Sequence, residues 1–159
     1  MQWCPRRVRA LSYTQLAVFD HYLTNPFNDW TDDHVAQGFA WRPGSVSFGT
    51  LESSGAIWVE VFRSRVLDNR ASMAERIIAV PFTVPEHGEI EVASISSSVV
   101  LQLPSAEYEL TFEHGQHSEG TMWANLYFRR VESPTTPRIL RADAELKMPP
   151  VFVMNAEPA

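Results

Sequence analysis

Short runs of alternating apolar and polar residues, interrupted by glycine, proline, asparagine and aspartate, limit the possible folds of this chain more than any other feature. In residues 9–20, every second side chain from Leu11 to Phe19 falls on one mostly apolar face. A period of two is the spacing of a half-buried β-strand, whose side chains alternate between two faces. We therefore predict that strands dominate the fold and that residues 9–20 form the first strand.

The same alternation predicts the strands that follow. We expect them at residues 45–50, 56–64, 75–84, 89–96, 99–103, 107–113 and 121–131, with 138–148 as a candidate last strand. Turn residues at 52–55 predict a hairpin of 45–50 with 56–64, and those at 85–88 predict a second hairpin of 75–84 with 89–96. Residues 66–73 are expected to form a polar connection. The predicted fold class is all-β, an antiparallel β-sandwich or open barrel of about 8–9 strands with one short helix.

Residues 29–39 depart from the strand pattern and indicate that helix. Thr31 is the expected N-cap, because its hydroxyl can accept a hydrogen bond from a free backbone N–H of the first turn. Asp32 and Asp33 follow where the helix dipole favours negative charge, and Gly38 suits the left-handed residue that ends a helix.

Length and composition predict one domain over residues 1–159, with a loose N-terminus at 1–9 and an irregular tail at 149–159. A single cysteine, Cys4, excludes an intramolecular disulfide. The N-terminal arginines are not followed by the apolar stretch of a secretory signal, so a cytoplasmic location is expected. No apolar run approaches the length of about 18 residues that a membrane helix needs, so membrane insertion is not expected.

The charge distribution predicts a cationic partner. The net charge is −6, and the stretch 77–128 contains no lysine or arginine. Its seven carboxylates are Glu86, Glu89, Glu91, Glu107, Glu109, Glu113 and Glu119. A surface built from this stretch would repel phosphate, whereas nucleic-acid binding requires lysine and arginine on the surface. Direct binding to nucleic acid is therefore not expected.

The residues that could support catalysis do not form a recognisable site. His114 and His117 with Glu113 and Glu119 could ligate a metal, but they fall in a predicted loop that would not fix their directions. Cys4 lies in the predicted loose terminus, where no base is held beside its thiol. Glycine-rich phosphate-binding loops are absent from the sequence. We therefore expect neither an enzyme nor a bound metal or cofactor.

Acidic and aromatic residues around the predicted helix are candidates for binding a protein partner. Aspartates 29, 32 and 33 lie close in sequence to two tryptophans, and acidic side chains beside exposed aromatic rings suit a cationic protein surface. The alternative for each tryptophan is a place in the core. The complete candidate set is Asp29, Trp30, Asp32, Asp33, Trp41, Glu52, Glu86, Glu113 and Glu119.

Several blocks of the sequence resemble the competence protein J family, the DNA-entry nuclease inhibitors. The resemblance covers roughly residues 11–115 and lies in LSYTQLAVF (11–19), DWTD (29–32), GF (38–39), GSVSF (44–48), VPF (80–82) and LPSAEYEL (103–110). Residues after 120 depart from the pattern. The resemblance implies a protein that binds and inhibits a bacterial DNase.

Two settings would suit such an inhibitor, which would occupy the cationic DNA-binding or active-site surface of its cognate nuclease. It could restrain a competence nuclease, or it could be an immunity protein against a secreted nuclease toxin. The alternative from another class is a small-ligand or carbohydrate-binding β-sandwich, because the chain has five tryptophans and four tyrosines.

Overall fold

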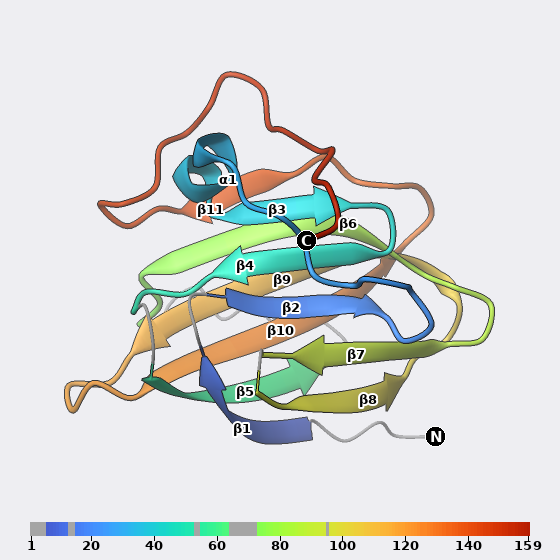
Figure 1. The fold of residues 1–159 in the computed structure, drawn as a ribbon, viewed down its shortest axis with the longest axis horizontal. Coiled ribbons are helices and arrows are strands. Elements are labelled where there is room, and N and C mark those ends of the chain that lie inside the picture. Colours follow the sequence, from blue (N-terminus) through green and yellow to red (C-terminus); the bar gives the residue numbers. More distant parts are fainter. Residues whose placement is uncertain (1–5, 13–14, 53–54, 64–72, 95) are drawn as a thin grey trace.

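The strands form two sheets that pack face to face, as the computed structural model shows for residues 6–12, 15–52, 55–63, 73–94 and 96–159 (Figure 1). In spatial order, sheet A contains β1 (Arg6–Ser12), β5 (Gly55–Phe62), β10 (Met122–Val131), β9 (Ala106–Gln116), β6 (Arg76–Val84) and β11 (Arg138–Arg141). Sheet B contains β3 (Phe39–Arg42), β4 (Ser45–Gly49), β2 (Gln15–Asp20), β7 (Glu89–Ala93) and β8 (Ser98–Gln102).

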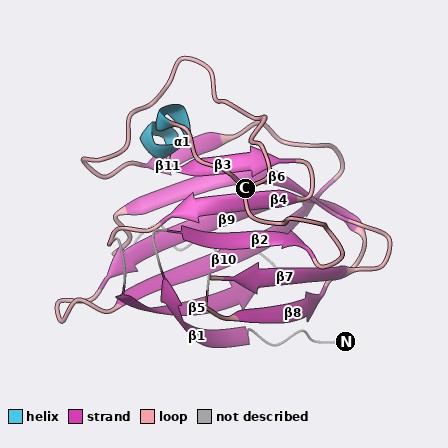
Figure 2. Cartoon of the chain, in the orientation of Figure 1, coloured by secondary structure: helices cyan, strands magenta, loops and turns pink. Residues whose placement is uncertain are grey.

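The all-β sandwich is confirmed. Neighbouring strands are antiparallel except β5 and β10, which are parallel. In the part of the chain that the structure describes, the only helix is α1 (Asp32–Gln37), which lies beside β3 (Figure 2). No helix among those residues is long and apolar enough to cross a membrane.

Aromatic and aliphatic side chains from both sheets fill the space between them. Phe48 on β4 stacks on Phe112 on β9 with ring centroids 4.5 Å apart, and this contact joins the two sheets. Tyr108 and Phe128, on neighbouring strands of sheet A, meet edge-on at 6.0 Å. Both arrangements are favoured by the charge distribution of aromatic rings.

Both predicted hairpins are wrong, because the chain changes sheets at each turn. β4 belongs to sheet B and β5 to sheet A, and β6 belongs to sheet A while β7 belongs to sheet B. β5 and β6 pair only with strands far away in the sequence, whereas β4 and β7 each form a hairpin with a different neighbour, β3 and β8 respectively. Of the first predicted turn, residues 53–54 lie outside the described residues, as does most of the predicted connection at 66–73.

The predicted first strand, residues 9–20, is two strands in different sheets. β1 pairs with β5 in sheet A, whereas β2 lies between β4 and β7 in sheet B. Residues 6–9 belong to β1, so the predicted loose N-terminus at 1–9 is too long. Residues 1–5, which include Cys4, lie outside the described residues. Together with β3, which was not predicted, this division gives eleven strands in the described residues rather than 8–9.

The C-terminal segment holds α1 against sheet B without forming regular structure. β11 ends at Arg141, earlier than predicted. The C-terminal segment after it, residues 142–159, forms no helix or strand apart from an isolated bridge of Pro158 with Asn28. The segment is nevertheless tied down, because Lys147 N donates to Ala36 O at 2.8 Å. The side-chain amide of Gln37 donates to Val153 O at 3.0 Å and accepts from Val153 N at 3.0 Å.

Candidate partner-binding surface

The short helix α1 begins and ends at the predicted residues. The Thr31 hydroxyl accepts from His34 N, and the His34 ring accepts from Thr31 N at 3.0 Å, so the two residues cap the helix reciprocally. His34 is buried, and this burial lowers its pKa. Gly38 ends the helix in the left-handed conformation with φ of 87°. The N-cap and the C-terminal glycine are therefore confirmed.

Two polar side chains close the end of the sandwich next to α1. Arg76 and His114 are paired across β6 and β9, and both are buried. The Arg76 guanidinium donates to Gly49 O at 2.8 Å, and Leu51 N donates to the His114 ring at 3.0 Å. Because both contacts reach the end of β4 and the residues after it, they link sheet A to sheet B where the apolar core ends.

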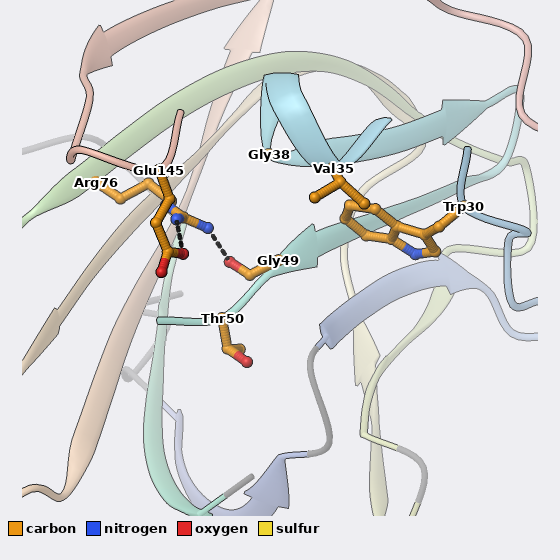
Figure 3. Close-up of a pocket in the computed structure, with 7 residues that line it drawn as sticks. All are labelled: Trp30, Val35, Gly38, Gly49, Thr50, Arg76 and Glu145. Atoms are coloured by element: carbon orange, nitrogen blue, oxygen red, sulfur yellow. Dashed lines mark hydrogen bonds and ion pairs between the residues drawn. The ribbon is translucent and has the colours of Figure 1, made fainter. Parts of the chain in front are cut away.

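A pocket of about 400 Å³ lies over this polar closure, and we call it the α1 pocket. Figure 3 shows its lining, with the side chains of two residues, Trp30 and Val35, on one side and those of Arg76 and Glu145 on the other. The complete lining is Trp30, Val35, Gly38, Gly49, Thr50, Arg76 and Glu145. The Trp30 ring is fixed because its N–H donates to the Gln15 side chain at 3.1 Å.

Most of the predicted acidic residues near the helix are exposed close to this pocket. Asp29, Asp32 and Asp33 are exposed, and none of them forms an ion pair in the described ranges. Glu52 is also exposed and follows Thr50, a residue of the pocket lining. The oxygen Oε1 of Glu52 accepts a hydrogen bond from the Gln116 amide at 3.3 Å. The structure therefore brings four predicted carboxylates to the α1 end of the sandwich.

Two other candidates, Glu86 and Trp41, lie toward the end of the sandwich opposite α1. β6 has nine residues and begins with Arg76 beside the α1 pocket. At about 3.3 Å per residue, the end of β6 lies roughly 26 Å away. Exposed Glu86 follows that far end, and the Trp41 indole N–H donates to Pro81 O of β6 at 2.8 Å. Trp41 also packs against the core, and a place in the core was the alternative expected for each tryptophan.

The predicted loop containing the two histidines begins as strand, because β9 extends to Gln116, and only residues 117–120 form a turn. His114 therefore lies inside the sandwich, and both of its ring nitrogens bind backbone groups. Glu113 is buried and accepts hydrogen bonds from Asn125 at 2.9 Å and Tyr127 at 3.2 Å. Burial, followed by the charge of Glu113, raises the pKa of Tyr127 to about 12. Glu119 is exposed in the turn after β9.

The seven glutamates of residues 77–128 do not form one acidic face. Glu89 and Glu91 point outward from sheet B, because the residues that follow each of them, Ile90 and Val92, are in the core. The glutamates of β9 belong to the other sheet, sheet A. Glu109, only 2% exposed, pairs with two arginines from outside the stretch, Arg129 at 3.0 Å and Arg138 at 3.1 Å. A stretch of sequence without lysine or arginine therefore does not form a surface without them, because arginines from other strands lie beside it.

Those arginines also determine how Glu109 ionises. Burial by itself would raise the pKa of this carboxyl, but the hydrogen bonds and charges of Arg129 and Arg138 hold its pKa below the usual range. Glu109 is therefore a structural anion whose charge is neutralised within the protein, and it is not available to a partner.

Sequence reasoning missed three residues of the α1 pocket region, namely Arg76, Asp143 and Glu145. The Arg76 guanidinium donates to both carboxylate oxygens of Asp143, at 3.1 and 2.9 Å, and lies 3.7 Å from Glu145. Asp143 and Glu145 stand 67 and more positions after Arg76 in the chain. No local pattern connects residues so far apart, so only the packing of the C-terminal segment could identify them.

Comparisons with known proteins agree with the resemblance found in the sequence. The model of the family described as competence protein J (ComJ) matches residues 9–130. The DNA-entry nuclease inhibitor of Bacillus subtilis (strain 168) is 33% identical over 110 residues, which are 69% of this chain and 80% of that protein.

Two solved structures have a similar fold. The crystal structure of ComJ, inhibitor of the DNA degrading activity of NucA, from Bacillus subtilis superposes with a TM-score of 0.63 and 26% identity, covering 81% of this chain and 96% of that one. The structure named crocagin biosynthetic gene J superposes with a TM-score of 0.54 and 14% identity, covering 80% of this chain and 98% of that one. At that identity, the second similarity shows the fold alone.

Proposed function

Because this chain belongs to the competence protein J family, we propose that it binds and inhibits a DNA-degrading enzyme and has no catalytic role itself. The partner is a cognate bacterial nuclease, and the inhibitor acts in the cytoplasm without binding nucleic acid. The relative that is described as an inhibitor of the DNA-degrading activity of NucA supports this proposal.

The exposed aspartates at the start of α1 carry the structural part of the proposal. Asp29, Asp32 and Asp33 are free of internal ion pairs in the described part of the chain, unlike Glu109. A nuclease needs lysine and arginine to hold phosphate, so its DNA-binding surface complements a fixed group of carboxylates. Complementary charge raises the association rate and favours the correct partner.

A degradation assay tests the proposal directly. The purified protein is mixed with the nuclease encoded nearest to its gene, and in parallel with NucA, and the survival of plasmid DNA is followed. We expect the DNA to survive at a molar excess of inhibitor and a complex to elute in gel filtration. If the plasmid is degraded at the same rate with and without the protein, and no complex forms, the proposed function is wrong.

The position of the interface is tested by kinetics. Replacing Asp29, Asp32 and Asp33 with asparagine should slow association more than it accelerates dissociation, and the effect should shrink as salt is added. Glu132→Gln is the control, because Glu132 is an exposed carboxylate that follows β10 at the end away from α1. Equal association rates for the triple variant and the control would place the interface elsewhere.

A further inference from the structure

The α1 pocket combines an apolar side with an anionic one, which is the combination that a long basic side chain needs. Val35 is 62% exposed although it is aliphatic, and it lines the pocket together with the half-buried ring of Trp30. Across the pocket, the side chain of Glu145 is 73% exposed (Figure 3). A lysine or arginine has an apolar stem and a charged head, so it can contact both sides at once.

The charge within the pocket is negative in spite of Arg76. The guanidinium of Arg76 is only 4% exposed and is paired with both oxygens of Asp143. Its remaining hydrogen bond goes to Gly49 O. Asp143 therefore balances the charge of Arg76, and because Glu145 is a second carboxylate, 3.7 Å from the same guanidinium, the three side chains carry a net negative charge at the pocket mouth. Asp32 is not part of the lining, but it adds negative charge nearby, because it lies three residues before Val35 and hence on the same side of the helix.

We infer that the α1 pocket receives a lysine or arginine side chain of the partner nuclease, with Trp30 and Val35 covering its stem and Glu145 binding its charged head. This inference rests on the proposed function. The volume of about 400 Å³ lies within the range of roughly 300–1,000 Å³ found for small-ligand sites and leaves room for one long side chain. An aromatic ring beside a cation adds a further attraction.

The pocket also links partner choice to the C-terminal segment. Trp30, Val35 and Arg76 lie within residues 9–130, the range that the family model matches, whereas Glu145 lies beyond it. The acidic side of the pocket is thus supplied by a segment outside the matched range. We expect Glu145 to contribute to the selection of the nuclease, because a new carboxylate can favour one basic partner over another.

Variants with little effect on folding test the inference against the nuclease. Glu145→Gln keeps the shape of an exposed side chain and should raise the Kd of the complex about tenfold, the loss of one charge-assisted contact. Val35→Ser should raise it severalfold, and Glu132→Gln should leave it unchanged. If the wild type binds but all three variants bind equally well, the inference is overturned while the proposed function stands. If the wild type does not bind, both fail.

A second measurement needs no nuclease. Nα-acetyl-L-arginine methylamide is titrated into ¹⁵N-labelled protein, with the citrulline analogue as a neutral probe of the same shape. We expect saturable shifts, at millimolar concentration, of the Trp30 indole signal and of the Gly38 and Gly49 amides. The shifts should be absent with citrulline and in Glu145→Gln. Equal shifts with both probes, or shifts confined to another surface, would overturn the inference.

Discussion

Acid should destabilise this protein through His114, and a substitution at this residue isolates the effect. Leu51 N donates to Nε2 of His114, so that nitrogen carries no proton, while Nδ1 donates to Trp123 O at 2.7 Å. A second proton would have to enter at Nε2, against a backbone N–H and inside the sandwich. Burial, reinforced by the nearby charge of Arg76, lowers the pKa of His114 to about 4.

The magnitude follows from the difference between the folded and unfolded pKa values. In the unfolded chain the imidazole has its ordinary pKa of about 6.5. Because the folded pKa is lower, the contribution of neutral His114 to stability is complete above pH 6.5 and is lost as the pH falls toward 4. Between pH 7 and pH 5, this linkage reduces the free energy of unfolding by about 2 kcal/mol.

Urea unfolding followed by tryptophan fluorescence at pH 7 and pH 5 measures this loss. His114→Gln is less stable at pH 7, because it loses buried hydrogen bonds, but it should lose about 2 kcal/mol less than the wild type on acidification. His117→Gln is the matched control, since it removes an exposed imidazole from the same end of β9 and should behave like the wild type. If His114→Gln and the wild type lose the same free energy between the two pH values, the reasoning is refuted.

Two substitutions at the ends of α1 test how the helix is held. Thr31→Ala removes the N-cap hydroxyl and should lower the free energy of unfolding by about 1 kcal/mol in urea denaturation, whereas the exposed Thr136→Ala should leave it unchanged. Gly38→Ala should cost about 2 kcal/mol or more, since its φ is 87° and the new Cβ would lie 2.8 Å from Leu146 and 2.9 Å from Ile78. Gly120→Ala has a similar φ of 99° and no atom within 4 Å, so a loss as large as that of Gly38→Ala would show that the contacts do not matter.

The features that could be predicted from the sequence are those that depend on neighbouring residues. The strand alternation, the cap at Thr31 and the left-handed Gly38 each involve residues within a few positions of one another, and the structure has all of them. The limits of prediction appear at the turns. A turn sequence reverses the chain, but it carries no information about which sheet the next strand joins, and both predicted hairpins failed for that reason.

For the candidate site, residue type indicated chemistry but not position. The aspartates beside α1 are exposed together, whereas Glu86 and Trp41 lie toward the other end and Glu113 is buried. Strand alternation could not identify the burial of Glu113, because β9 is buried on both faces from residue 108 to residue 115 and the Glu113 carboxylate is covered by Asn125 and Tyr127 of the neighbouring strand.

The amino-acid sequence by itself determined the all-β class, the single helix with its caps and the family, because local periodicity, local hydrogen bonding and blocks of characteristic residues depend on short segments. Only the tertiary structure decided which carboxylates are neutralised by distant arginines and which remain exposed. It also placed Glu145 across from Trp30 to complete the α1 pocket. The physical reason is that charge pairing and burial act between residues close in space, and the two-sheet packing sets those distances.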